Sequence, residues 1–80
     1  SEVKQEVFLK DPGHYVGALI EKLNLKGFSI GGAKISEKHG GFIVNFNNAS
    51  GEDIIKIIIE VKKQVLENFG IDLEIEQRII

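Results

Sequence analysis

Charged side chains alternate along the last ten residues, IDLEIEQRII. In an extended strand, Asp72, Glu74 and Glu76, followed by Arg78, fall on one side of the backbone. A carboxyl group that points into a cleft can act as a general acid. The same pattern is typical of a solvated strand face whose acids lie opposite lysines of a neighbouring strand. The pattern by itself leaves both interpretations open.

The two histidines are the other candidates for chemistry. His39 lies in a glycine-flanked turn beside Glu37 and Lys38, whereas His14 lies near the expected start of a helix. Lone histidines are more often structural or solvated than catalytic. Because the two are far apart and have no clear third ligand, the sequence predicts no metal site. The absence of cysteine excludes disulfides and thiolate sites.

Five glycines lie in the stretch KGFSIGGAKISEKHGGFIVN, residues 26–45. Gly31-Gly32 with Lys34 raises the question of a phosphate-binding loop, but neither the GxxxxGK[ST] nor the GxGxxG spacing is present. The favoured interpretation is a turn or bulge where one backbone approaches another.

A second glycine-containing run, KHGGFIVNF at residues 38–46, is similar to the RNA-binding signature K-G-F-G-F-V-x-F. That signature sets its last two aromatic residues three apart, whereas Phe42 and Phe46 are four apart. They should therefore share one side of a strand, most simply the core. With a net charge of −2, the chain is expected not to bind nucleic acid.

The composition limits the classes of protein to which the chain can belong. The chain has 80 residues, of which 42% are hydrophobic and 28% are charged. These values are typical of a single globular domain, here spanning residues 1–80. The longest apolar runs, such as residues 57–59, are far too short to span a membrane, and no signal peptide is visible. A cytoplasmic location is the expectation. The chain contains no methionine, which suggests that it was trimmed or rebuilt.

The apolar periodicity predicts the elements that must position these residues. Strand-like alternation or helical spacing of apolar side chains marks each segment. We expect a strand at 2–10, a helix at 14–24, short strands at 28–30, 33–36 and 42–46, a long helix at 51–69 and a strand at 71–80. This order predicts an α+β fold with a small mixed β-sheet and two helices packed on one face.

Capping residues mark the expected helix ends. Asp11 and the following proline should start the first helix, and Gly27 should end it in a left-handed conformation. Ser50 and Asp53 resemble a capping arrangement for the long helix, and Gly70 should end it. The buried row of the long helix is expected at positions 54, 58, 61 and 65, widened by 55, 59, 66 and 69, with position 57 off the stripe.

Taken together, these segments resemble a known family. The run PGHYVGALIEKLNLKGFSIGGAKISEKHGGFIVNFNNAS, followed by a long helix ending in NFGIDLEIEQRII, is similar to the C-terminal domain of UDP-N-acetylenolpyruvoylglucosamine reductase, also called UDP-N-acetylmuramate dehydrogenase. The likeness extends from about Val7 to Ile80. Its motifs are specific in combination: G-x-L-I-E, L-K-G before I-G-G-A, S-E-K-H before F-I-V-N, and the closing E-x-R-I-I.

The resemblance implies a chemistry and roles for particular residues. The family uses FAD and NADPH to reduce the enolpyruvyl group of UDP-N-acetylglucosamine enolpyruvate in peptidoglycan precursor synthesis. It assigns a catalytic role to Glu76, the glutamate of the closing motif, and substrate-binding roles to Lys10 and His39. Stabilising charge that exists only in the transition state is what such a catalytic residue would contribute.

Several departures from the family pattern affect these expectations. Glu6 stands where the family has its proton-donating serine, and a glutamate, being normally ionised, is a poor substitute for a neutral hydroxyl. Gln77 replaces the valine of the closing motif. Residues 1–6 match nothing in the family and look like a rebuilt or appended strand. Eighty residues also leave no room for the FAD-binding part, and the cofactor supplies the hydride chemistry.

Two expectations follow for the chain as a whole. The first is a substrate-binding domain, isolated or re-engineered, that has no turnover alone because the missing flavin domain is its natural partner. The alternative is an engineered isolated-domain scaffold that has neither ligand nor activity.

Overall fold

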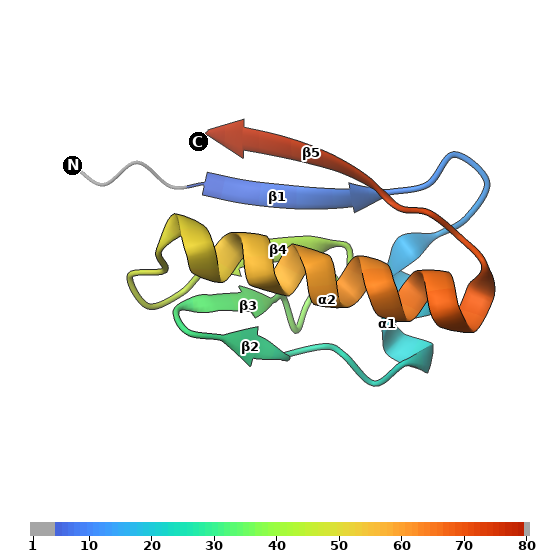
Figure 1. Ribbon diagram of the computed structural model, residues 1–80, viewed down its shortest axis with the longest axis horizontal. Helices are drawn as coiled ribbons and strands as arrows, with labels where there is room; N and C mark the ends of the chain where they lie inside the picture. Colours follow the sequence, from blue (N-terminus) through green and yellow to red (C-terminus); the bar gives the residue numbers. More distant parts are fainter. Residues whose placement is uncertain (1–4, 80) are drawn as a thin grey trace.

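The computed structural model describes residues 5–79, with side chains over residues 6–77. Five strands and two helices follow one another in the order predicted from the sequence (Figure 1). They are β1 (Gln5–Lys10), α1 (Val16–Lys22), β2 (Ser29–Ile30), β3 (Ala33–Ile35), β4 (Phe42–Asn45), α2 (Gly51–Phe69) and β5 (Glu74–Ile79). The predicted α+β class is confirmed. Of the segment expected to be rebuilt, residues 1–4 lie outside the described residues, and Gln5 and Glu6 open β1.

The strands form one sheet in the order β2-β3-β4-β1-β5, and every described neighbouring pair is antiparallel. The expected mixed sheet was therefore wrong in its strand directions. Since β4 and β5 are both antiparallel to β1, they run parallel to each other, as a helical crossover such as α2 requires. They are not neighbours because β1 lies between them.

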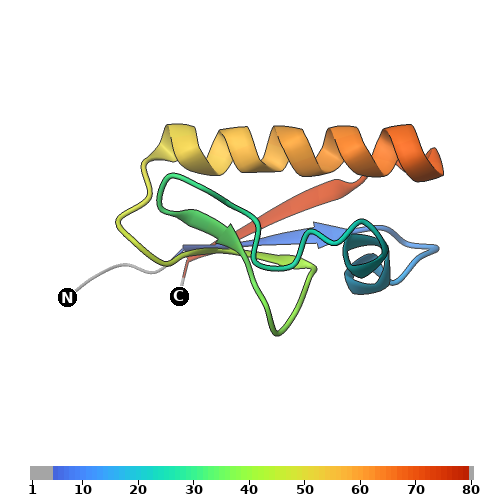
Figure 2. The same cartoon turned by 90° about the horizontal axis from the view of Figure 1, so that it is seen from below.

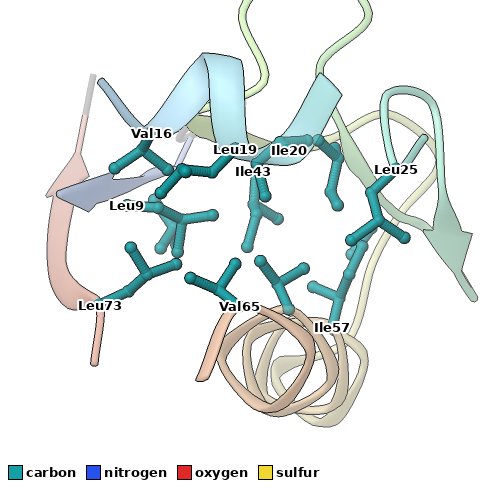
Figure 3. Packing of buried hydrophobic residues seen from close by; sticks show 13 residues of the cluster. Leu9, Val16, Leu19, Ile20, Leu25, Ile43, Ile57, Val65 and Leu73 are labelled. Atoms are coloured by element: carbon teal, nitrogen blue, oxygen red, sulfur yellow. The ribbon is translucent and has the colours of Figure 1, made fainter. Parts of the chain in front are cut away.

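The two helices occupy different places relative to the sheet. α2 forms a layer over one face, whereas α1 lies beyond the end of the sheet that is remote from the termini (Figure 2). Both contribute to one hydrophobic cluster. Figure 3 shows Val16, Leu19 and Ile20 of α1 directed towards Leu9 and Ile43 of the sheet and towards Ile57 and Val65 of α2. The sheet surface that points away from α2, here called the open face, carries no helix among the described residues (Figure 2).

The buried row of α2 agrees with the predicted one at Val61 and Val65 and differs at Ile57, which was expected to lie off the stripe. Its fully buried side chains are Ile57, Val61 and Val65. Ile55 and Ile59, which were expected to widen the buried stripe, are 58% and 60% exposed. Because of its isoleucines, the helix has apolar positions on nearly all sides, so helical spacing alone does not specify which row is buried. The buried row is the one that faces the sheet, and this contact forms only in the folded chain.

The long helix has the predicted ends. The Ser50 hydroxyl accepts from the Asp53 backbone N–H at 3.0 Å, and the Asp53 carboxylate accepts from the Ser50 N–H at 3.1 Å. This reciprocal capping box satisfies two N–H groups that the helix leaves unpaired. Gly70, with φ 69°, ends the helix in the left-handed conformation, and its N–H donates to the Leu66 carbonyl. A glycine in this conformation is a common helix end because it carries no Cβ.

The first glycine pair serves this same helix end. The Gly32 N–H donates to the Asp53 carboxylate at 3.2 Å, and the Gly32 carbonyl accepts from Phe46 and Asn47. A Cβ on Gly32 would meet the Asn47 carbonyl oxygen, and one on Gly31, at φ 56°, would meet the Asp53 carboxylate. The predicted close approach of two backbones is confirmed. The pair holds the turn between β2 and β3 against the start of α2.

The ends of α1 were predicted wrongly. Its N-cap is Tyr15, which makes no side-chain capping bond, whereas Asp11 accepts from the Gly13 N–H at 3.1 Å and lies 2.6 Å from His14 Nδ1. Asn24, at φ 57°, is the left-handed residue that follows the helix, and Gly27, at φ 81°, belongs to the next turn. Asparagine tolerates this conformation better than most residues with a side chain, so the helix stops earlier than the glycine indicated.

Acid should weaken the fold through Asp53. Hydrogen bonds from the backbone N–H groups of Ser50 and then Gly32 lower the pKa of this carboxyl below its ordinary value of 3.8. Since the pKa is lower in the folded state, the stabilisation is complete above pH 3.8 and is lost as the pH falls through the folded-state pKa. We expect the urea midpoint of the chain to drop between about pH 6 and about pH 2.5.

An Asp53→Asn variant isolates this contribution because its amide does not titrate in that range. Every other carboxyl group is common to both proteins, so the variant should lose less stability over the same interval. Parallel declines of the two urea midpoints would show that Asp53 is not the titrating cap.

Candidate functional site

A row of three side chains crosses the middle of the open face. Phe8 of β1 is the register partner of Glu76 in β5 on one side and of Phe42 in β4 on the other. The rings of Phe8 and Phe42 pack edge to face, with centroids 4.3 Å apart at 85°. This geometry is favourable for aromatic pairs and fixes both rings. Strand pairing thus places a carboxylate at one end of an aromatic platform.

Lys10 joins this row at the Glu76 end. Its Nζ lies 3.3 Å from Glu76 Oε1, and the two side chains are 51% and 40% exposed. The register opposes Lys10 to Glu74, so the ion pair with Glu76 is diagonal. An exposed pair of this kind contributes only about 0–1 kcal/mol. Lys10 can therefore exchange its partner for another anion at little cost.

His39 joins the row at the Phe42 end. Its ring centroid lies 5.2 Å from that of Phe42. The backbone N–H groups of Lys38 and His39 both donate to Ser36 Oγ at 3.2 Å, which holds the turn between β3 and β4. This turn projects on the side of the sheet opposite α2 (Figure 2).

The second glycine pair fixes where this turn lies. A Cβ on Gly40 would be 3.0 Å from Ile20 Cβ, so the absence of a side chain lets the turn approach α1. The Gly41 carbonyl accepts from the Leu9 N–H at 2.8 Å, which ties the turn to β1. The glycines of the middle segment thus support packing, and through packing they position His39.

A hollow of about 210 Å³ lies between the turn and the start of α1. Tyr15, His39 and Phe42 contribute rings to its lining, and Leu9 and Val16 contribute apolar surface. Gly17 and Gly41 complete the lining. The hollow is therefore mostly apolar and is bordered by residues from three separate segments of the chain.

The structure brings some of the sequence-predicted site residues together and leaves others apart. Lys10 and Glu76 meet as an ion pair, and His39 lies at the other end of the aromatic row, with Phe8 and Phe42 in between. Glu6 lies on the same side of β1 as Phe8 and pairs in register with Val44. Asp72 precedes β5, and its carboxylate pairs with Lys62 of α2 at 3.5 Å. The roles assigned to Glu76, Lys10, His39 and Glu6 remain predictions.

Three aromatic residues were misassigned from the sequence. Tyr15 falls inside the helix expected at 14–24, but it precedes α1 and is 77% exposed. Phe42 and Phe46 were assigned to the core, whereas the buried residue of β4 is Ile43 between them. Phe46 is 51% exposed and has Lys34 Nζ 5.1 Å from its ring centroid. Strand alternation identified the shared side of the two phenylalanines but not which side is covered.

Neither a metal centre nor a membrane-spanning helix is found among the described residues. Between residues 5 and 79, no group of three or more histidine, aspartate or glutamate side chains is arranged to hold a metal ion. Over the same part of the chain, neither helix has the length and apolar character needed to cross a lipid bilayer.

The family model and the similar proteins found by comparison indicate the same family. A family model described as UDP-N-acetylenolpyruvoylglucosamine reductase, C-terminal domain, matches residues 5–80. Proteins named UDP-N-acetylenolpyruvoylglucosamine reductase are similar to the chain. The one from Thermosipho melanesiensis is 57% identical over 67 residues, covering 84% of this chain and 23% of the relative. The one from Alkaliphilus metalliredigens is 50% identical over 74 residues, covering 92% of this chain and 24% of the relative. The chain thus spans about a quarter of the length of these relatives.

Proposed function

The chain belongs to the UDP-N-acetylenolpyruvoylglucosamine reductase family, whose C-terminal domain it matches, and we propose that it is the substrate-binding part of such a reductase. Its ligand is UDP-N-acetylglucosamine enolpyruvate, bound on the open face during cytoplasmic synthesis of peptidoglycan precursors. The observation that carries this proposal is the Lys10–Glu76 pair, which sets a cation and a carboxylate side by side at the end of an aromatic row.

The hollow beside the start of α1 does not fit the FAD that the family uses. It measures about 210 Å³. Pockets that enclose even drug-sized ligands are larger, at about 300 Å³ or more. FAD and NADPH would therefore be held by the part of a reductase that corresponds to the other three quarters of the relatives. The chain alone should bind substrate without turning it over.

Lys10 would bind the diphosphate of the substrate. Its ammonium group is half-exposed and held by a surface ion pair. An ammonium–phosphate hydrogen bond is charge-assisted and stronger than a neutral one. His39, held at the hollow by the Ser36 bonds, would contact the same ligand from the other end of the row.

Glu76 would act on the enolpyruvyl group. To act as a general acid, the Glu76 carboxyl group would have to be protonated where it meets the enolpyruvyl group. A protonated Glu76 can donate a hydrogen bond to the negative charge that develops during reduction, where a pre-positioned donor is most effective.

Loss of the Lys10 ammonium group should weaken binding of the nucleotide sugar. We expect Lys10→Ala to raise Kd about ten- to hundredfold, because a hydrogen bond to a charged group contributes about 1.5–3 kcal/mol. Calorimetric titration of the chain with UDP-N-acetylglucosamine enolpyruvate measures this. Lys63→Ala is the matched control because Lys63 is an exposed lysine of α2, on the opposite side of the sheet.

Equal effects of the two substitutions would indicate a general loss of positive charge and would remove Lys10 from the site. Absence of binding at millimolar ligand would reject the proposal and favour a folded domain that has neither ligand nor activity.

A further inference from the structure

Four large apolar side chains are exposed on the side of the sheet that carries α2. Ile55, Ile59 and Leu66 of α2 are 58%, 60% and 51% exposed, and Ile75 of β5 is 38% exposed. We propose that these four residues, here called the α2 patch, form the contact between two copies of the chain. This inference goes beyond the proposed function, which places the substrate on the open face.

The helical and the strand residues of the α2 patch lie on the same side of the sheet. With Lys62, the three α2 residues follow a spacing of four, three and four, which sets them along one row of the helix. Lys62 Nζ lies 3.5 Å from the carboxylate of Asp72, which directly precedes β5, so this row borders β5. Ile75 is the register partner of the buried Leu9, and its side chain therefore points to the α2 side.

The β5 half of this side lacks a second covering layer. Strands lie about 4.8 Å apart and packed helices about 10 Å apart, so one helix covers about two strands. α2 packs on β2, β3 and β4, and Figure 1 shows β1 and β5 beside it rather than beneath it. Among residues 5–79, no other helix lies over β5. Apolar positions on nearly all sides of α2 are typical of a helix that is covered on more than one side.

The charges around the α2 patch favour a second copy over a charged partner. Each lysine there has an acidic neighbour: Lys56 with Glu52 at 3.2 Å, Lys62 with Asp72 at 3.5 Å, and Lys63 with Glu67 one helical turn later. Because the charges balance within one chain, two copies can meet without an excess of like charge. A nucleic acid or an anionic membrane would require an unbalanced cluster of lysines.

The rest of a reductase is expected on the other side of the sheet. FAD must meet the substrate, so under the proposed function the part that holds FAD lies over the open face. In this respect the inference rests on the proposed function. The α2 side then remains accessible, and a patch that meets its own copy does so about a two-fold axis.

The dimensions of this side are sufficient for a weak dimer. The 19 residues of α2 span about 28 Å, and the molecule is 21 Å wide. Two such faces in contact bury about 600 Å² each, or about 1,200 Å² together, which is the lower limit for specific interfaces. We therefore expect association at high micromolar rather than nanomolar concentration.

Sedimentation equilibrium of the chain, from micromolar to millimolar concentration, tests the inference. The average mass should rise towards twice that of one chain. Ile59→Lys should raise the dimer Kd about a hundredfold or more, because the two-fold axis brings two uncompensated charges into an apolar contact. Lysine favours helices, so this variant should remain folded, as circular dichroism would verify. Phe46→Lys is the matched control because Phe46 is 51% exposed and lies against Lys34, outside the α2 patch.

NMR spectra of the ¹⁵N-labelled unmodified chain locate the contact without any substitution. On dilution, the amide signals of Ile55, Ile59, Leu66 and Ile75 should shift, whereas that of Phe8 on the open face should not. Association that only Ile59→Lys abolishes, with dilution shifts in the α2 patch, would support the inference.

Three results would overturn it. The first is a chain that stays monomeric at millimolar concentration, which would leave the α2 patch to another occupant, such as the rest of a reductase. The second is an equal loss of association in both variants, and the third is a set of dilution shifts confined to the open face. None of these results involves the nucleotide sugar, so the proposed function is tested separately by the Lys10→Ala titration.

Discussion

Glu6→Ser is expected to raise kcat about a hundredfold or more in a chimera that can turn over substrate, because general acid catalysis typically contributes about 10²–10⁴-fold. In this chimera, the chain replaces the matching segment of the Thermosipho melanesiensis reductase, which is 57% identical to it over 67 residues. The family resemblance places a proton-donating serine at position 6. Glu6 lies on the open face, diagonal to Glu76 across β1 and β5. Its carboxylate would oppose the negative charge that develops there.

The comparison needs a variant that removes the carboxylate without supplying a hydroxyl. Glu6→Ala meets this requirement and should raise kcat much less than Glu6→Ser, because it relieves the charge but supplies no proton donor. NADPH absorbance at saturating nucleotide sugar measures all three proteins. If Glu6→Ala raises kcat as much as Glu6→Ser, relief of charge is the whole effect and position 6 donates no proton.

Ile57→Ala should destabilise the fold more than any surface change. Ile57 is fully buried where α2 faces the sheet. Truncating a buried isoleucine to alanine costs about 2–5 kcal/mol through lost burial and the cavity left behind. At about 0.05–0.15 kcal/mol per residue, a chain of this length has a total stability of roughly 4–12 kcal/mol. The variant should therefore lose a large part of its free energy of unfolding, measured by urea denaturation.

Ile59→Ala is the matched control for this prediction. It removes the same atoms from the same helix two residues away, but Ile59 is 60% exposed. The free energy of unfolding should change by less than about 0.5 kcal/mol. Similar losses for the two variants would contradict the placement of α2 on the sheet.

Local signals in the sequence predicted the elements well. The capping residues Ser50 and Asp53 and the terminating Gly70 gave the long helix its observed bounds. The alternation near the start of the chain predicted a strand at residues 2–10, where the described residues contain β1 (Gln5–Lys10). These signals act within a few residues and need no knowledge of what lies across the core.

Long-range relations could not be predicted in the same way. The position of β1 between β4 and β5 made the sheet antiparallel, and nothing in one strand's pattern specifies its neighbours. Helical spacing offered several apolar rows on α2, and only the approach of the sheet selected the row containing Ile57. Asn24 ended α1 before Gly27 because two residue types can adopt the left-handed conformation.

In the candidate site, too, local features could be predicted from the sequence and long-range relations could not. The family resemblance identified Lys10, Glu76 and His39. Strand alternation assigns Lys10 to one side of its strand and Glu76 to one side of another, but it does not relate the two sides. The register that joins those sides, and the aromatic row between Glu76 and His39, appear only in the fold. The hollow was missed because Tyr15 has the spacing of a core residue. An aromatic residue two positions before a glycine at a helix start was the available signal.

A crystal structure of the chain with UDP-N-acetylglucosamine enolpyruvate bound would test most directly whether the open face is the substrate site. We expect the diphosphate oxygens within hydrogen-bonding distance of Lys10 Nζ, and the Lys10–Glu76 pair, 3.3 Å long without ligand, to be broken. The enolpyruvyl group should lie against the Glu76 carboxyl group. A ligand bound on the α2 side of the sheet, or one on the open face with the Lys10–Glu76 pair intact, would contradict it.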